Sequence, residues 1–346
     1  MRNLWKLLAV VLALVLVGAA CGNDDDSSEP APSEPTQEAA PATQAPEPTE
    51  VVEVQPTQGC DHTYHVITHG DSGVFWSVVE VAVRDAAAAI GCEVVYIGSN
   101  NDAVKQASDI RAAIAAGSSG IAISLADPAG VEGAAREVVE AGIPLYTLNS
   151  GVNNYKDLGG VTHIGQTETV AGNGAGERFN ALGATHVLCA RQEQSNVALE
   201  ERCNGLAETF NGEVTSEFVG LDAEPETQQN QIAAILQGDS SIDGVLGVGP
   251  NLPLRALEAG EQAGRDLVIG GFDLSSDLID EIEAGRVAFT VDQQQYLQGY
   301  LPVILMHLQA TNQNTAGGGL PILTGPGFVD TANASVVKAL VAEGTR

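Results

Sequence analysis

Short apolar runs alternate with longer helical stretches along the chain from about residue 60. The runs with the length and β-branched content of strands lie at 63–69, 92–98, 120–124, 144–149, 186–190, 244–249, 267–273 and 288–292. The stretch after the first run has apolar residues at helical spacing, at Phe75, Val78, Val79, Ala82, Val83 and Ala86. Strands that alternate with helices predict parallel sheets with helices on both faces. Two sheets are expected, because the chain after residue 59 is longer than one average domain.

Two later helical stretches, 103–117 and 131–142, each end with glycine, the usual helix stop. The alternation then continues far enough to build a second sheet. We expect the chain to pass from one domain to the other near residues 160–168, with His163 as a strand residue at that boundary.

Residues 1–20 have the pattern of a secretory signal peptide. Arg2 and Lys6 precede a short apolar run, and small residues lead to Cys21. The apolar run is too short to favour a membrane-spanning helix. A cysteine after small residues is also typical of bacterial lipoproteins, in which Cys21 carries the lipid, whereas the alternative is an ordinary signal with a chance cysteine. We expect an exported protein that is anchored by lipid to the outer face of the cell membrane.

Residues 21–58 consist mainly of acidic, small polar, alanine and proline residues. Such a segment cannot bury enough apolar surface to fold, so it is predicted to be a disordered, proline-rich tether. The formal net charge of the chain is −30. This charge argues against a nucleic-acid partner, which needs basic patches, and against direct binding to an anionic lipid surface. Membrane association is therefore expected only through the lipid.

The remaining cysteines are even in number, which in an exported chain predicts disulfides. A metal site is the alternative, but no CxxC spacing is present and the histidines are scattered, so no metal and no cofactor are expected. Of the possible connectivities we favour Cys60–Cys92 and Cys189–Cys203. Cys60 and Cys92 each precede a predicted strand, and consecutive strands of a βαβ unit usually lie near each other.

Polar and aromatic residues follow the predicted strands. In open parallel sheets, ligands bind beyond the carboxyl ends of the strands. The residues at these places are His69, Phe75, Trp76, Asn100, Asn101, Asp127, Asn149, Ser150, Arg191, Glu193, Pro250, Asn251, Asp273 and Gln293. Carboxylates, amides and arginine suit hydroxyl groups, and aromatic rings pack on the C–H faces of sugar rings. The set therefore predicts a site for a polyhydroxyl ligand.

Segments in the same order resemble those of the periplasmic sugar-binding proteins of ABC importers, of the ribose and galactose type. They are GVFWSVVEVAVRDAAAAIG (73–91), GIPLYTLNS (142–150), HIGQTETVAGNGAGE (163–177), NVALEERCNGL (196–206), GFDLSSDLIDEIEAG (271–285) and FTVDQQQYLQGY (289–300). The resemblance covers essentially all of 60–330. It implies an α/β fold of two Rossmann-like lobes, each a parallel sheet with helices on both faces, joined by a multi-strand hinge. The implied lobes are 59–164 plus about 294–324, and 165–293 plus about 325–346.

The resemblance also implies roles for individual residues. Phe75 and Trp76 match the aromatic clamp of the family, and Arg202 matches its ligand-binding arginine. Asp273 and Gln293 match residues that bind sugar hydroxyls.

Further candidates complete the predicted ligand site. Asn149 ends a matching strand, and Asn251, with its neighbour Pro250, falls where the family has an asparagine. His69 and Glu193 are included because they follow predicted strands. Ribose-type members have Asp-Arg where this chain has Asn149 and Ser150, so we expect a ligand other than ribose.

Structural roles are the alternatives at these positions. The rings of Phe75 and Trp76 could belong to the core, although two adjacent helical positions are not expected to face inward together. Arg202 could form a surface ion pair with a neighbouring glutamate, and Asp273 could cap the helix that follows it. Asn149 could serve only as a turn residue.

The resemblance implies a monomeric solute-binding lipoprotein that is not an enzyme. It would bind a monosaccharide or small polyol between its lobes and deliver it to ABC permease subunits in the membrane. A receptor that passes closure to a sensor kinase is the alternative. A repressor with the same lobes would need an N-terminal DNA-binding helix pair, and an export signal occupies that place. An enzyme is disfavoured, since the sequence has neither a GxSxG elbow nor a P-loop.

Overall fold

The N-terminal lobe is built on a sheet with the strand order β11-β5-β4-β3-β1-β2, in a computed structural model that describes residues 60–346. All neighbouring strands in this sheet are parallel. The strands are β1 (Thr63–Thr68), β2 (Glu93–Gly98), β3 (Gly120–Ser124), β4 (Leu145–Leu148), β5 (His163–Gln166) and β11 (Ile322–Gly325). The predicted signal peptide, Cys21 and the tether lie outside the described residues.

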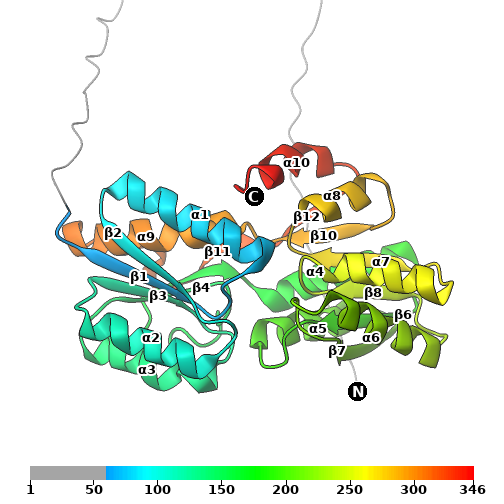
Figure 1. The fold of residues 1–346 in the computed structure, drawn as a ribbon, viewed down its shortest axis with the longest axis horizontal. Helices are drawn as coiled ribbons and strands as arrows, with labels where there is room; N and C mark the ends of the chain where they lie inside the picture. Colours follow the sequence, from blue (N-terminus) through cyan, green and yellow to red (C-terminus); the bar gives the residue numbers. More distant parts are fainter. Residues whose placement is uncertain (1–59) are drawn as a thin grey trace, which may run out of the picture. The chain divides into compact units, whose positions relative to one another are not determined.

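Helices cover both faces of this sheet (Figure 1). The helices are α1 (Gly73–Ile90) and α9 (Gln295–Asn312) on one face, and α2 (Ala103–Ala115) and α3 (Pro128–Glu140) on the other. Side chains alternate across the strands, so that Val66 packs under α1 and α9 while Ile67 packs against α2 and α3. Each face therefore has its own apolar core.

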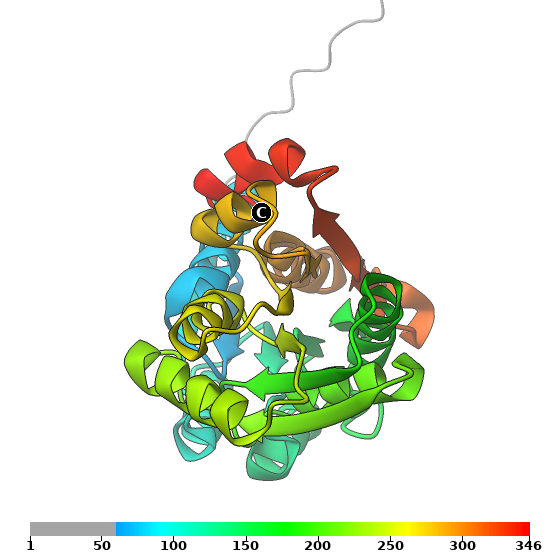
Figure 2. The same cartoon turned by 90° about the vertical axis from the view of Figure 1, so that its right-hand side faces the viewer.

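The C-terminal lobe repeats this plan with the strand order β12-β10-β9-β8-β6-β7. Its strands are β6 (His186–Arg191), β7 (Glu213–Phe218), β8 (Gly244–Gly247), β9 (Val268–Phe272), β10 (Phe289–Asp292) and β12 (Gly327–Asp330). Its helices are α4 (Glu168–Leu182), α5 (Val197–Thr209), α6 (Pro225–Gly238), α7 (Leu252–Ala263), α8 (Ser276–Glu283) and α10 (Ala334–Ala342). Figure 2 shows this lobe turned toward the viewer, with its sheet between helices.

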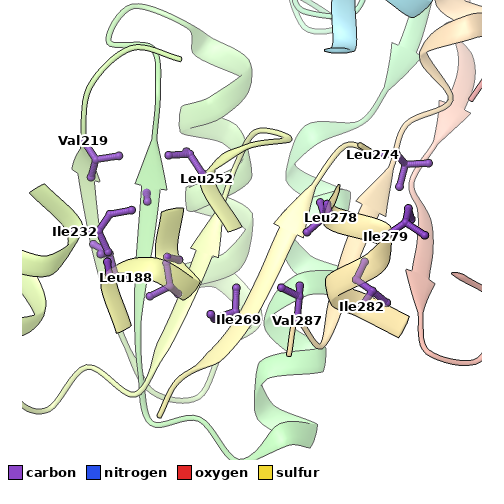
Figure 3. Close-up of a cluster of buried hydrophobic side chains, with 14 of the residues drawn as sticks. Leu188, Val219, Ile232, Leu252, Ile269, Leu274, Leu278, Ile279, Ile282 and Val287 are labelled. Atoms are coloured by element: carbon purple, nitrogen blue, oxygen red, sulfur yellow. The ribbon is translucent and has the colours of Figure 1, made fainter. Parts of the chain in front are cut away.

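Two apolar cores also form in the C-terminal lobe. Leu188 of β6 points to the core built with α6, α7, α8 and α10, part of which Figure 3 shows. Val187 points to the other core, built with α4 and α5. Adjacent residues of a strand thus point to opposite faces of the sheet. Because helices cover both faces of this sheet, neighbouring residues of its central strands are mostly apolar, and the sequence there is a nearly continuous apolar run.

The chain passes between the two sheets three times, from β5 into α4, from β10 into α9, and from β11 directly into β12. The first two passages enter a helix, and the third runs from strand to strand through Pro326. Because β12 enters without a crossover helix, it pairs with β10 in the antiparallel direction at the edge of the sheet. The fold is the predicted pair of α/β lobes.

All strands predicted from the sequence are present, and His163 lies in β5 as expected. The strands β7, β11 and β12 were not predicted. Strand β7 has the sequence EVTSEF and forms an edge of its sheet, so it lacks the apolar run that marks a central strand. Strands β11 and β12 are four residues each and flank the sequence Gly325-Pro326, which reads as a turn.

Both predicted disulfides are present in the structure. Cys60 and Cys92 join the starts of β1 and β2, which pair in parallel from Thr63 and Glu93 onward. Cys189 of β6 is bonded to Cys203 of α5, with 5.8 Å between the Cα atoms. The second bridge therefore fixes α5 against the sheet just beside Arg202.

Candidate functional site

A cavity of about 230 Å³ lies where the strands of both lobes end. It is lined from the N-terminal lobe by the segment after β1 and by residues after β2 and β4, and from the C-terminal lobe by residues after β6, β7, β8, β9 and β10. The nine residues predicted as ligand-binding all line it: His69, Phe75, Trp76, Asn149, Glu193, Arg202, Asn251, Asp273 and Gln293. The rule that places ligands beyond strand ends thus brings the predicted residues from six strand ends, those of β1, β4, β6, β8, β9 and β10, to one space.

Two aromatic rings and an imidazole form the N-terminal wall of the cavity. Trp76 lies edge-to-face against Phe75 and against His69, with 4.9 Å between ring centroids in both cases. Gly70 makes room for the indole, because a Cβ at that position would lie 2.0 Å from Trp76 Nε1. The glycine-rich turn before α1 therefore lets the indole pack over the end of β1.

Phe75 and Trp76 are each 8% exposed, so the expectation that only one of two adjacent helical positions faces inward is wrong here. Both rings are buried because they lie in the first turn of α1, beside the cavity. One side of this turn packs on the apolar core, and the adjoining side lines the cavity. Both rings belong to the apolar core under α1 and also line the cavity.

Arg202 reaches the cavity from α5 and is held by a buried carboxylate. Its Nε and Nη2 donate to Glu168 over 2.7 and 3.2 Å, and Nη1 donates to the carbonyl of Val248 over 2.8 Å. Arg202 is 3% exposed and Glu168 only 1%. The ion pair is therefore sealed from water, unlike the surface pair with a neighbouring glutamate that was the alternative.

Close packing of α4 on α5 makes this ion pair possible. A Cβ at Gly172 would lie 2.2 Å from the carbonyl of Arg202, and a Cβ at Gly205 would lie 2.2 Å from the carbonyl of Thr169. Glycine at both positions lets the helices approach until Glu168, in the first turn of α4, meets the guanidinium. Glu168 was missed in the sequence, because a glutamate in a first helical turn is common without any partner.

Asp273, Gln293 and Asn149 form a hydrogen-bonded chain across the cavity floor. Gln293 Nε2 donates to Asp273 Oδ1 over 2.6 Å, and Gln293 Oε1 accepts from Asn149 Nδ2 over 3.3 Å. Gln298 Nε2 also donates to Gln293 Oε1, over 2.9 Å, which fixes the orientation of that amide. The chain joins a residue of each lobe through Gln293, which lies in the second passage between the sheets.

The backbone at Asp273 and Asn149 is left-handed, with φ of 68° and 61°. This conformation costs free energy for residues other than glycine, and it turns both side chains toward the cavity at the ends of β9 and β4. Ser275 rather than Asp273 caps α8, since its Oγ accepts from the amide of Leu278 over 3.2 Å. The capping alternative for Asp273 is therefore excluded.

Burial sets the protonation of the charged groups around the cavity. It raises the pKa of Asp273 to about 6, although Arg202, whose Nη1 lies 3.8 Å from Asp273 Oδ2, opposes this shift. Burial lowers the pKa of His69 to about 3, with the positive charge of Arg202 adding to the effect, so the imidazole is neutral. Burial also raises the pKa of Glu193.

His69 and Glu193 meet across the two lobes. His69 Nε2 lies 3.7 Å from Glu193 Oε2, and Ser124 Oγ lies 2.8 Å from His69 Nδ1. Asn196 Nδ2 donates to the same carboxylate oxygen over 2.8 Å. Asn196 was not predicted, because as the first-turn cap of α5 it reads in the sequence only as a helix start.

Asn100 and Asn101, which the sequence grouped with the other strand-end residues, also line the cavity. Other polar residues of the lining were not predicted, among them Asp71, Gln192, Asn196 and Asp222. Gln192 has a buried Oε1 with no hydrogen-bond partner in residues 60–346. Asn251 begins α7 without donating or accepting a side-chain cap hydrogen bond, so its amide is available to the cavity. Buried polar atoms without a partner favour a polar ligand at that place.

Metal binding finds no support in this cavity. In the described part of the chain, the one cluster with metal-ligand spacing is Cys60, Cys92 and His307, and its two cysteines are bonded to each other.

Within residues 60–346 no helix combines the length and the apolar character needed to cross a bilayer.

The sequence profile of the periplasmic binding protein domain matches residues 64–314, which is most of the chain. The chain belongs to the periplasmic binding protein family. This binding protein is accordingly an extracytoplasmic solute-binding component of a transporter and not an enzyme.

Several known proteins are similar to this binding protein. A solved carbohydrate transporter from Acidothermus cellulolyticus 11B, in complex with myo-inositol, is 38% identical with a TM-score of 0.80, over 82% of this chain and 100% of that one. The xylose/arabinose-binding protein XylF of Sulfolobus acidocaldarius is 26% identical over 285 residues, 77% of this chain and 70% of XylF. The ribose import binding protein RbsB of Bacillus subtilis is 25% identical over 233 residues, 66% of this chain and 74% of RbsB.

Proposed function

We propose that this binding protein takes up an uncharged monosaccharide or small cyclic polyol in the 230 Å³ cavity and delivers it to the membrane subunits of an ABC importer. The observation that carries this conclusion is the pairing of an aromatic wall, Trp76 and Phe75, with a floor of fixed polar groups. A sugar or cyclitol ring has both kinds of surface, apolar C–H faces and a rim of hydroxyls.

The polar floor suits hydroxyl groups because it offers acceptors and donors side by side. Asp273 has one oxygen occupied by Gln293 and a second that faces Arg202 at 3.8 Å, a separation that a ligand hydroxyl can bridge. Asn149 and Asn251 add amides from opposite lobes. A hydroxyl that accepts from Arg202 and donates to Asp273 uses both of its hydrogen-bonding capacities.

The charge of the lining favours an uncharged ligand over an anionic one. Asp71, Glu193, Asp222 and Asp273 line the cavity, whereas Arg202 is the cation that reaches it, and Glu168 already neutralises that cation. A sugar phosphate or uronate would add a further negative charge beside these carboxylates, which costs free energy by like-charge repulsion. Myo-inositol is the first ligand to test, because the 38% identical relative holds it.

Contacts between the lobes outside the cavity describe a closed form. The amide of Val197 donates to the carbonyl of Ala126 over 3.0 Å, and Asn153 Nδ2 donates to Glu201 over 2.9 Å. A ligand that touches both lobes stabilises this form over an open one, since its contacts exist together only when the lobes meet. The closed form is the one that would dock on the permease.

The anchor and the assembly state belong to the same proposal. Lipid on Cys21 would hold the protein at the membrane through the tether of 21–58, with the folded part acting as a monomer. Mass spectrometry of the exported protein tests this: an N-terminal peptide that starts at a lipid-modified Cys21 is expected, and a peptide that starts elsewhere would exclude the anchor.

A thermal-shift screen with pentoses, hexoses, inositols and sugar acids tests the ligand class. A ligand that binds only the folded protein raises its melting temperature. At least one uncharged sugar or cyclitol is expected to do so, and Asp273→Ala is expected to remove the shift while the protein stays folded. If no uncharged member of the panel shifts the melting temperature, the proposed function is wrong.

A further inference from the structure

A second cavity, of about 410 Å³, lies beside the first. It is lined by the start of α2, by the segment before α3, and by residues 193–196 of the C-terminal lobe. The residues that line both cavities are His69, Asn101, Glu193, Asn196 and Leu221. The two spaces are therefore neighbours across one shared wall. We call the first the inner cavity and the second the outer cavity.

Gln106 brings an unused polar atom to the outer cavity. The residue is 1% exposed, and its Nε2 donates to the carbonyl of Ser124 over 2.8 Å and to that of Ile67 over 3.4 Å. Those two bonds orient the amide, while its Oε1 accepts no hydrogen bond from any residue in 60–346. The amide oxygen is therefore oriented by the two bonds of its own NH2 group and is free to accept a hydrogen bond from a ligand hydroxyl in this cavity.

Two aspartates at the same cavity offer further acceptors. Asp102 caps α2 and Asp127 caps α3, and each uses Oδ1 for its cap. The second oxygen of each carboxylate has no hydrogen-bond partner among residues 60–346. Asn101, on the shared wall, likewise has a side-chain amide without a partner in the described chain.

Apolar surface completes the outer cavity. Val104 is 80% exposed and Leu221 is 44% exposed, and both line it together with Ala103 and Ala126. Large apolar side chains left open to solvent beside oriented polar groups are typical of a binding surface. Acceptors beside apolar side chains repeat, in a wider space, the two kinds of surface that the inner cavity offers to a ring.

We propose that the outer cavity binds a second sugar ring, so that this protein takes a glycoside, meaning a sugar or cyclitol that carries another sugar, as well as a single ring. The inner ring lies against Trp76, and the outer ring lies over Val104 and Leu221 with its hydroxyls on Gln106 and the two aspartates. The glycosidic bond passes the shared wall beside Asn101. This inference rests on the proposed function, because it extends the same site.

Isothermal titration calorimetry on the full chain tests this with matched pairs: myo-inositol and its α-galactoside, D-xylose and xylobiose, D-galactose and melibiose. For at least one parent that binds, the Kd of the glycoside is expected to lie within about tenfold of the parent's or below it. Parents that bind while every glycoside is weaker by more than about tenfold would overturn the second-ring site and leave the proposed function intact. If neither member of any pair binds, the second-ring site is overturned, and the thermal-shift screen with the wider panel decides the proposed function.

A substitution in the outer cavity separates its contribution from that of the inner one. Ser195 is exposed, lines only the outer cavity and makes no side-chain hydrogen bond among residues 60–346. Ser195→Phe is expected to fill that space and to lower the ratio of glycoside to parent affinity by about tenfold or more. Ser335→Phe, on exposed α10 and in neither cavity, is the matched control. An unchanged ratio in Ser195→Phe would place the second ring elsewhere and overturn the inference.

Discussion

Glu168→Gln is expected to destabilise the protein strongly, although Glu168 is not part of the predicted ligand set. The substitution keeps the size of the side chain and removes its charge. Arg202, 3% exposed, then keeps Asp273, at 3.8 Å, and the more distant Glu193 as nearby negative charges. Removing one partner of a buried ion pair typically costs about 3–5 kcal/mol. Glutamine can still accept one of the two hydrogen bonds from Arg202, so we expect about 3 kcal/mol.

Thermal unfolding followed by circular dichroism measures this effect. With an unfolding entropy of about 2.1 cal/mol/K per residue, a loss of about 3 kcal/mol lowers the melting temperature of a folded part of this length by roughly 5 °C. Glu137→Gln is the matched control, since Glu137 pairs with Arg111 on the surface and exposed pairs contribute little. A Glu168→Gln protein that melts within about 1 °C of the parent would show that the buried pair does not hold α4 to α5.

Further predictions concern Asp273, the lobe contacts and the disulfides. Asp273→Asn is expected to stabilise the ligand-free protein by up to about 3 kcal/mol at pH 7.5, because the pKa of Asp273 in the folded state, about 6, lies above its ordinary 3.8. For the same reason the parent gains stability relative to Asp273→Asn as the pH falls from 7 toward 4, and denaturation curves with no such difference would contradict this. Asn153→Ala is expected to lower ligand affinity, because it removes a hydrogen bond to Glu201 that exists only in the closed form. Asn154→Ala is the neighbouring control. Equal ligand affinities of Asn153→Ala and the parent in calorimetry would refute this prediction. Peptide mapping without reductant is expected to find Cys60–Cys92 and Cys189–Cys203, and free thiols would contradict the pairing.

The fold was predictable because its signal is local. Buried strands such as β3, with the sequence GIAIS, read as apolar runs, and helices such as α1 read as repeats at helical spacing. The strands that escaped, β7, β11 and β12, lie at sheet edges or beside the Gly325-Pro326 turn. Their pairing depends on distant segments, which a local pattern does not contain.

The cavity lining was predictable for a different reason. A parallel sheet brings its strand ends to one edge, so residues such as Asp273 and Asn149, far apart in sequence, could be grouped from strand positions alone. Glu168 and Gln298 escaped because they act through other side chains, Arg202 and Gln293. Such contacts depend on how closely α4 packs on α5 and on where the chain passes between the lobes.

Fluorescence of Trp76 tests the central claim most directly. In the full chain with Trp5→Phe, Trp76 is the only indole, and it lies in the wall of the cavity. Titration with myo-inositol and with uncharged pentoses and hexoses is expected to give a saturable change in its emission for at least one ligand, as a ring displaces water from the indole. An emission spectrum that none of these ligands changes at saturating concentration would contradict a polyol site beside Trp76.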